Sequence, residues 1–203
     1  MTHGRVPLAA VCAALLAAPL AAGAQPAGDS ERGRAVFTAK ECARCHRPVG
    51  DAGSGPPLEA LKRPQGAFEL AGRLWNHAPA MFTLLRREGI PWPAVSPAEM
   101  GDLIAYLEGD PRRDPPVDLA RGQMLLVRKG CLKCHSVMGE GARVGPELAH
   151  RRAAYDSVTT WASTMWIHTP RMAARAQELG VLFPRFADAE MGNLVGYLRS
   201  VAR

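Results

Sequence analysis

The chain has 203 residues, of which 47% are hydrophobic and 22% are charged, and its formal net charge is +6. Glycine and proline together account for 37 residues, below the share at which composition alone indicates disorder. No apolar run after residue 22 approaches the ~18 residues that span a bilayer, so we predict no transmembrane segment in the mature chain.

Residues 1–24 have the pattern of an export signal. They carry one charge, Arg5, followed by an apolar run over residues 6–22, and they end in Ala-Gly-Ala, a small-x-small pattern typical of signal-peptidase cleavage. We expect a signal peptide at 1–24 and an exported, soluble protein that begins near Gln25, in the periplasm of a bacterium. An uncleaved membrane anchor is the alternative interpretation of the same run.

Two cysteine pairs, each followed directly by histidine, dominate the rest of the chain. They are Cys42 and Cys45 before His46, and Cys131 and Cys134 before His135. Four cysteines in an exported chain ordinarily indicate two disulfides. A zinc site of four thiolates usually has its pairs only ~15–20 residues apart, much closer than these.

C-x-x-C-H is the attachment signature of c-type haem, and it decides among these alternatives. The two thiols form thioether bonds to the porphyrin, and the histidine that follows is the proximal ligand of the iron. Two such motifs therefore predict two covalently bound haem c groups, with His46 and His135 as iron ligands.

Both motifs lie in a duplicated unit of about 90 residues. Gly33 and Gly122 each precede the first cysteine of a motif by nine positions. Three further markers recur at an offset of 90 or 91: Gly-Pro-x-Leu, Trp-x-His-x-Pro-x-Met and Glu-Met-Gly-x-Leu. Matching order indicates two tandem domains rather than a solenoid, which needs at least three repeats. A stretch rich in proline and charge at 109–116 separates them. We predict domain 1 at 25–110, a linker at 111–117 and domain 2 at 118–203.

Each copy is expected to be helical, since no stretch shows convincing strand alternation. A first helix around Gly33 and Phe37, and its counterpart around Gly122 and Leu126, leads into each haem motif. The last helix of each copy has apolar residues at i, i+3, i+4 and i+7, from Met100 and from Met191.

Capping residues mark the start of that last helix. Ser96 and Glu99 have the spacing of a capping box, with a proline at the first helical position between them. In the second copy Ala187 replaces the serine, and Asp188 is the expected cap.

The order of these elements resembles the class I cytochrome c fold, and the pair resembles the dihaem bacterial cytochromes c. The resemblance rests on a first helix, C-x-x-C-H, a Gly-Pro-x-Leu loop, a Pro-x-Met loop and a final helix with a Tyr-Leu pair. It implies an all-α fold of two tandem domains, each wrapped around one haem. It further implies that the carbonyls of Pro56 and Pro146 accept hydrogen bonds from the proximal imidazoles, and that Met81 and Met172 are the distal iron ligands.

Other side chains compete for the distal position. His77 and His168 each precede the methionine by four residues, and bis-histidine ligation would give a lower potential than thioether ligation. The proline between them is expected to end the helix and turn the chain, so that both cannot reach the iron together. We favour the methionines and expect the histidines to hydrogen-bond within their loops.

Several other repeated or conspicuous residues receive a simpler interpretation. Met100 and Met191 are expected in the core, the tryptophans against haem or in the core, and His150 on the surface. The tryptophans are Trp75, Trp92 and Trp166.

Two haems with histidine and methionine ligands have no open coordination position, so one-electron transfer is the chemistry that remains. We therefore predict an electron carrier rather than an enzyme, exchanging electrons with a redox donor and an acceptor. A haem enzyme, or the electron-entry subunit of a periplasmic oxidoreductase, is the alternative, and a redox sensor is a third.

Charge is divided unequally between the copies. Residues 25–115 have 12 basic and 12 acidic side chains, whereas residues 116–203 have 12 basic and 7 acidic ones. We expect domain 2 to dock an acidic redox partner and domain 1 to exchange electrons through a more neutral surface. Scattered arginines that only keep the domain soluble are the alternative. Nucleic acid is not an expected partner.

Overall fold

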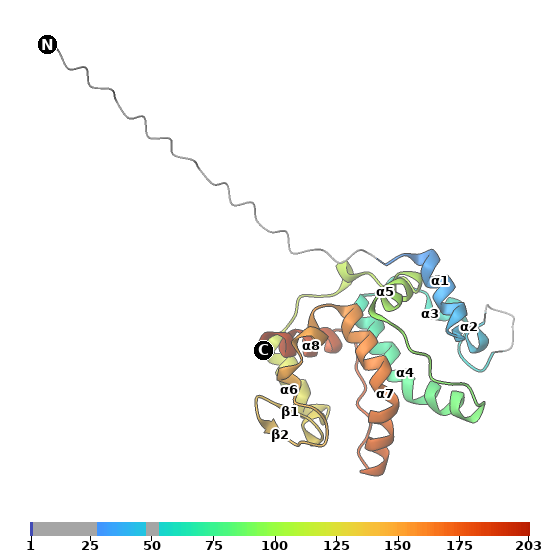
Figure 1. The fold of residues 1–203 in the computed structure, drawn as a ribbon. Coiled ribbons are helices and arrows are strands. Elements are labelled where there is room, and N and C mark those ends of the chain that lie inside the picture. The colour runs from blue at the N-terminus through green and yellow to red at the C-terminus, as the bar shows by residue number, and fades with distance from the viewer. Residues whose placement is uncertain (2–27, 48–52) are drawn as a thin grey trace.

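The computed structural model of the protein describes Met1, residues 28–47 and residues 53–203. The predicted signal peptide, apart from Met1, and its cleavage site lie outside the described residues. The fold is all-α, as predicted, and the described part contains a single antiparallel pair of two-residue strands (Figure 1). No helix within the described ranges is long and apolar enough to cross a membrane.

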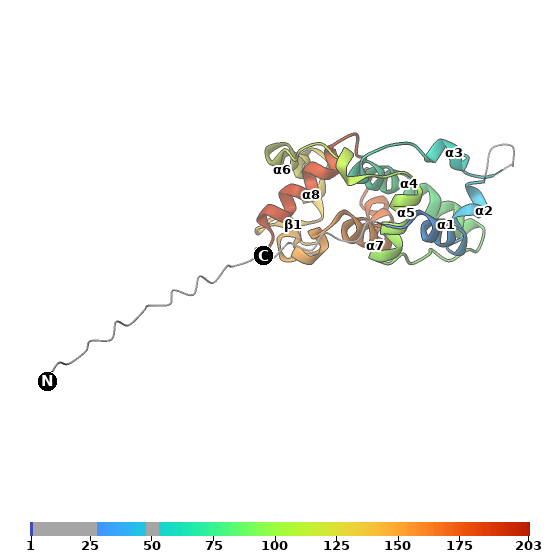
Figure 2. The same cartoon turned by 90° about the horizontal axis from the view of Figure 1, so that it is seen from above.

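The two copies contain corresponding elements in the same order. The first copy comprises α1 (Ser30–Ala39), α2 (Cys42–Cys45), α3 (Leu58–Leu61), α4 (Ala67–Arg87) and α5 (Pro97–Tyr106), followed by the 3-10 turn η1 (Pro111–Arg113). The second comprises α6 (Leu119–Arg128), η2 (Cys131–Lys133), β1 (Ser136–Val137), β2 (Glu140–Gly141), η3 (Leu148–His150), η4 (Arg152–Tyr155), α7 (Val158–Glu178) and α8 (Glu190–Val201). Seen from above, α6 and α8 lie at one end of the molecule and α1 to α3 at the other (Figure 2).

The first and last helices of each copy pack against each other, α1 on α5 and α6 on α8. They are in close contact at Gly33 and Gly122, where a Cβ atom would overlap the carbonyl oxygens of Asp102 and Asn193. The repeated glycine therefore permits the helices to cross. Met100 and Met191 are each 1% exposed, so their predicted place in the core is confirmed.

The predicted cap of α5 is present, and the predicted cap of α8 is wrong. The hydroxyl of Ser96 accepts from the backbone N–H of Glu99, and the Glu99 carboxylate accepts from the N–H of Ser96. In the second copy Ala189 is the N-cap, because Asp188 adopts a left-handed backbone with φ of 43°. Glu190 still accepts from the N–H of Ala187, which keeps half of the box.

The long helices α4 and α7 continue through proline, contrary to the expectation that proline ends them. Pro79 and Pro170 lie inside helices of 21 residues each. A proline inside a helix leaves the carbonyl four residues earlier without its helical partner. In α7 that carbonyl belongs to Trp166, and the indole of Trp92 donates to it over 3.0 Å. A residue of the first copy thus compensates the proline of the second.

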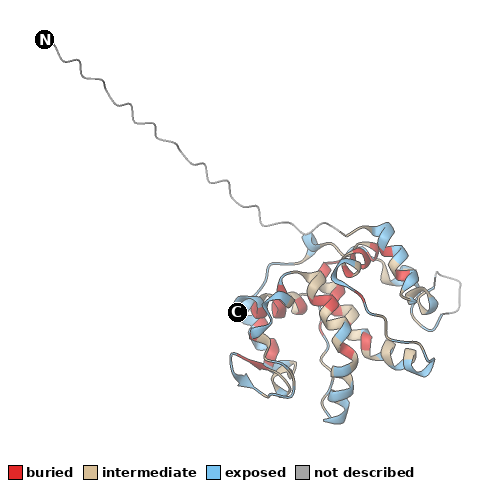
Figure 3. Ribbon diagram, in the orientation of Figure 1, coloured by how far each residue is buried: buried red, intermediate tan, exposed pale blue. Residues whose placement is uncertain are grey.

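The copies pack against each other through these long helices. α4 packs on both α7 and α8, and α7 packs on both α4 and α5. Four positions of α4 and their counterparts 91 residues later in α7 line one small cavity between the helices. They are Ala71, Leu74, Trp75 and Ala78, with Ala162, Met165, Trp166 and Thr169. Buried residues gather where α4, α5, α7 and α8 meet (Figure 3).

The connector between the copies rests on the start of α4. Asp110 donates its N–H to the Gln65 carbonyl over 2.9 Å, and the carboxylate of Asp114 accepts from the N–H of Phe68 over 2.9 Å. Because α4 has no cap from its own N-cap residue, Gly66, Asp114 supplies that bond from the connector.

A charged contact in the first copy has an uncharged counterpart in the second. The carboxylate of Asp102 accepts from the N–H of Asp29 at 2.7 Å and from two nitrogens of Arg32 at 3.0 Å. In the second copy the amide oxygen of Asn193 accepts from the N–H of Asp118 at 2.8 Å. The hydrogen bonds from Arg32 lower the pKa of Asp102 below its usual value.

This difference predicts a pH-dependent effect of Asp102→Asn. A carboxyl whose pKa is lowered by folding stabilises the folded state above its unfolded pKa, ~3.9, and that stabilisation is lost as the pH falls through the folded value. We expect the variant to be less stable than the wild type at neutral pH, and the difference to vanish well below pH ~4. Urea unfolding measures both. A difference that stays constant over this range would contradict the assignment to charge.

Candidate functional site

The first cysteine pair lies on the single helical turn α2, directly after α1. Cys42 and Cys45 are half-buried free thiols, and Glu41 before them has a left-handed backbone with φ of 63°. Burial raises the pKa of the Cys42 thiol to about 11. Both thiols are thus unpaired and on one turn, as attachment to a single group requires.

The second pair has the same arrangement on the 3-10 turn η2. Cys131 and Cys134 are free and half-buried, and Gly130 before them has φ of 73°. Burial raises the pKa of Cys131 to about 11 as well. The structure therefore has no disulfide among these four cysteines. Among the described residues, no group of three or more His, Cys, Asp or Glu is arranged to hold a metal ion.

The histidine after each pair is oriented by the carbonyl of a proline. Nδ1 of His46 lies 2.9 Å from the Pro56 oxygen, and Nδ1 of His135 lies 3.0 Å from the Pro146 oxygen. A carbonyl only accepts, so Nδ1 carries the proton and Nε2 is left as the metal-binding nitrogen. This is the contact that the resemblance implied for the two prolines.

A glycine lies directly against each of these imidazoles. A Cβ atom at Gly55 would stand 2.7 Å from Cε1 of His46, and one at Gly145 would stand 2.5 Å from Cε1 of His135. Any side chain at these positions would displace the ring. The ring of Phe37 also lies near His46, with 6.4 Å between the ring centroids.

An open cavity of about 370 Å³ adjoins the first cysteine pair, within the usual size range of ligand and cofactor sites. It extends from the α2 turn to the residue after α4. Its lining residues are Arg44, Cys45, Arg47, Gly53, Ser54 and Glu88. Neither His46 nor Met81 lines this cavity, and its lining is largely polar and charged, so the fit to a covalently attached haem rests on the free thiols and the oriented imidazole.

The predicted distal ligands lie on α4 and α7 rather than on loops. Met81 and Met172 are half-buried, two residues after the helical prolines. His77 and His168 lie one turn earlier on the same face, so the argument that a chain turn separates histidine from methionine is wrong. Each histidine bonds through Nδ1 to the carbonyl four residues back, at 2.7 Å.

A lysine beside each cysteine pair was missed by the sequence analysis. Nζ of Lys40 donates to the Ala94 carbonyl at 2.7 Å and pairs with Glu99 at 2.8 Å. In the same way, Nζ of Lys129 donates to the Arg185 carbonyl at 2.7 Å and pairs with Glu190 at 2.6 Å. Both lysines lie two residues before the first cysteine of a motif, and this repetition in the sequence could have identified them.

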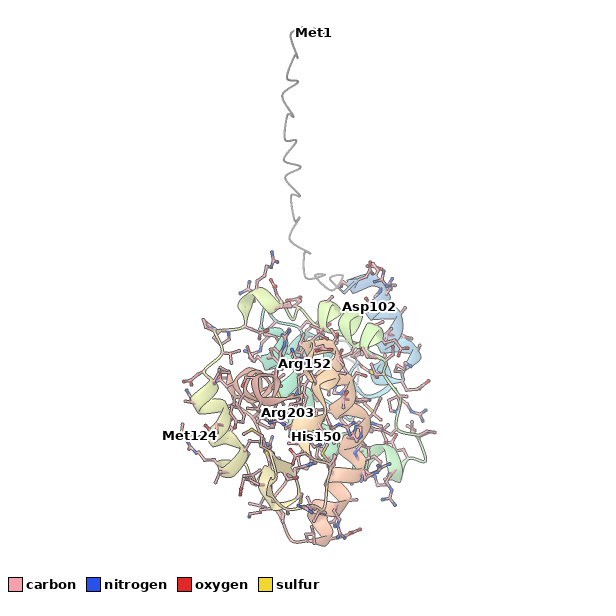
Figure 4. The ribbon with its side chains drawn as sticks, turned by 60° about the vertical axis from the view of Figure 1, so that its left-hand side comes forward. Met1, Asp102, Met124, His150, Arg152 and Arg203 are labelled. Carbon is pink, nitrogen blue, oxygen red and sulfur yellow. The ribbon has the colours of Figure 1, made fainter. Side chains whose placement is uncertain are left out.

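Trp75 is buried in the hydrophobic core and Trp166 packs against it, as the core expectation had it, and both also lie between the copies. The indole of Trp75 donates to the Pro184 carbonyl, and that of Trp166 donates to the Pro93 carbonyl, both at 2.7 Å. His150 is exposed, as expected (Figure 4).

Comparison with known families supports the same organisation. A profile of the cytochrome c family matches residues 30–109 and, separately, residues 119–202, once in each copy. A search of curated proteins found no match. Cytochrome c domains carry covalent haem and exchange electrons with redox partners. The chain therefore belongs to the cytochrome c family and contains two of its domains in tandem.

Proposed function

We propose that the protein is an exported dihaem c-type cytochrome of the bacterial periplasm that transfers single electrons between a donor and an acceptor. The repeated cysteine, histidine and proline-carbonyl geometry is the observation that carries the proposal, because it prepares one imidazole in each copy for iron. The signal-like pattern of residues 1–24 supports export.

The residues of each copy divide the work of holding one haem. Cys42 and Cys45 would bind the first porphyrin covalently, and Nε2 of His46 would bind its iron from the proximal side. Cys131, Cys134 and His135 would hold the second. When bound, the haem iron supplies the change between ferrous and ferric states. The protein sets the potential and the exposure of the haem edge.

Methionine is the better distal candidate in both copies. In the first, Met81 is half-buried whereas His77 is exposed, so the thioether lies closer to the protein interior. In the second, Met172 packs against the hydrophobic core. Thioether ligation raises the potential and leaves no coordination position for a substrate, which favours electron transfer over enzymatic chemistry.

Haem content tests the two-site assignment. We expect the exported protein to begin near Gln25 and to carry the mass of two haem groups, since each cysteine pair binds one. The double variant Cys131→Ser/Cys134→Ser should retain one haem. Intact-mass spectrometry measures both. Fewer than two haem additions in the wild type would contradict the proposal.

The second copy is proposed to dock an acidic redox partner. It has the basic excess, and apart from Met1 all large apolar side chains that are exposed in the described residues lie at 117–182. Met124 and Val127 on α6 are examples, 53% and 70% exposed, and Met124 lies at the outer edge of that helix (Figure 4). Their counterparts in the first copy are Ala35 and Thr38. Exposed apolar side chains with basic neighbours suit a partner whose acidic groups steer the encounter.

Charge reversal tests this docking assignment. Lys40 and Lys129 are not reversed in this test, because each forms an ion pair within the fold. The variants instead reverse exposed basic residues near the cysteine pair of each copy. We expect Arg128→Glu/Lys133→Glu to slow electron transfer about tenfold or more at low salt, and the effect to fade as salt shortens the Debye length to ~10 Å at 0.1 M. Arg44→Glu/Arg47→Glu is the matched control in the first copy. The measurement is the stopped-flow rate of electron transfer at several ionic strengths. Equal effects from the two double variants would contradict the proposal.

A further inference from the structure

We propose that each copy positions the haem site of the other copy, through Trp166 acting on the first haem and Trp75 acting on the second. The proposal rests on the proposed two-haem function. It concerns the segments between the long helix and the last helix, residues 90–95 and 181–186, which we name the first and second distal segments.

The first distal segment is held by α7 of the second copy. The indole of Trp166 donates to the Pro93 carbonyl at 2.7 Å, and the buried hydroxyl of Ser163 donates to the Val95 carbonyl at 2.6 Å. Trp92 stacks on Trp166 with ring centroids 4.2 Å apart, and its own indole donates to the Trp166 carbonyl. Four contacts thus join this segment to the opposite copy.

The second distal segment is held by α4 of the first copy in the reciprocal way. The indole of Trp75 donates to the Pro184 carbonyl at 2.7 Å, and its ring stacks on Phe183 with centroids 4.8 Å apart. The side-chain amide of Asn76 exchanges two hydrogen bonds with the backbone of Phe186, at 2.7 and 2.8 Å.

Each distal segment also contacts the haem site of its own copy. The lysine that precedes the cysteines binds a carbonyl of the segment, Lys40 at Ala94 and Lys129 at Arg185. Each distal segment therefore contacts both the lysine beside its own cysteine motif and a tryptophan of the opposite copy. A shift of that tryptophan is transmitted to the haem site because the packed contacts leave little room for independent movement.

In the first copy the chain of contacts extends to the residue next to the predicted ligand. Phe82, next to Met81, packs edge-on against Trp92 with centroids 5.8 Å apart, and Trp92 stacks on Trp166. Ala173 occupies the position of Phe82 in the second copy. The first haem should therefore depend on Trp166 more strongly than the second depends on Trp75.

The test removes one indole N–H while keeping an aromatic ring. We expect Trp166→Phe to change the ferric-to-ferrous ratio of the first haem at a fixed potential by up to about tenfold, which is ~59 mV for a one-electron couple, and to change the second haem less. Amide exchange over residues 90–96 should become faster. Trp75→Phe should shift the second haem and residues 181–187, by a smaller amount.

Trp161→Phe is the matched control. Trp161 lies on the same helix as Trp166, but its indole contacts the sulfur of Met191 within its own copy at 3.0 Å. This variant should leave the first haem's potential and the exchange of residues 90–96 unchanged.

Met81→Ala and Met172→Ala show which measured reduction potential belongs to which haem, because each variant should change the potential of one haem only. The proposal is overturned if Trp166→Phe shifts only the potential that Met172→Ala moves, or if Trp161→Phe has the same effect as Trp166→Phe. If neither methionine variant moves a potential, the proposed ligands are wrong. Amide exchange then decides the present proposal by itself, and unchanged exchange over residues 90–96 in Trp166→Phe would overturn it.

Discussion

Met81→Ala should lower the reduction potential of the first haem by on the order of 0.1 V or more, within the ~0.8 V range that axial ligands control. The thioether favours ferrous iron, and its removal leaves the iron high-spin or ligated by another group. Met172→Ala should do the same to the second haem. Potentiometric titration with absorbance detection measures both, and in each variant one ferric haem should lose the absorbance band from methionine sulfur to iron.

His77→Ala and His168→Ala are the matched variants one helical turn away. Because each histidine ring is bonded to a backbone carbonyl of its own helix, we expect both potentials to stay near their wild-type values. If a histidine variant lowers a potential and the methionine variant of the same copy does not, the ligand assignment is wrong.

Gly33→Ala and Gly122→Ala should each destabilise the protein by about 1–3 kcal/mol or more. At both positions the added Cβ overlaps a backbone carbonyl of the helix that crosses it, so the helices must separate. Alanine otherwise favours a helix over glycine by about 0.5–1 kcal/mol, and the clash must exceed this gain for the variants to be destabilised. Urea unfolding of the haem-loaded protein measures the change.

Gly72→Ala separates the clash from the general effect of replacing a helical glycine. Gly72 lies in α4, where an added Cβ would meet Met191 and Phe186 at 3.5 and 3.6 Å, an ordinary contact distance. This variant should be neutral or slightly more stable. Equal destabilisation at Gly72 and Gly33 would show that the crossing geometry is not the cause.

Local sequence patterns predicted the parts of the fold that depend on local chemistry. The apolar spacing from Met100 and from Met191 identified α5 and α8, and the Ser96–Glu99 box formed as expected. The C-x-x-C-H motifs predict thiols on a single turn before a histidine, because attachment to one group requires those residues close together, and the structure has this local arrangement.

Most of the parts that sequence reasoning missed depend on contacts between the copies. Pro79 and Pro170 indicate helix ends when read locally, but α4 and α7 pack on each other and Trp92 binds the carbonyl that Pro170 leaves free. Asp188 failed as a cap because its own backbone is left-handed, which its residue type does not reveal. The constant 91-residue offset placed Trp75 and Trp166 in equivalent positions without indicating that each binds the other copy.

A spectroelectrochemical titration of the intact protein tests the central claim most directly, that two haems with histidine and methionine ligands transfer single electrons. We predict two one-electron transitions, with the absorbance band from methionine sulfur to ferric iron present for both haems in the oxidised protein. A single transition, or a ferric haem that lacks this band and binds an added small ligand at once, would contradict the account and favour a haem enzyme.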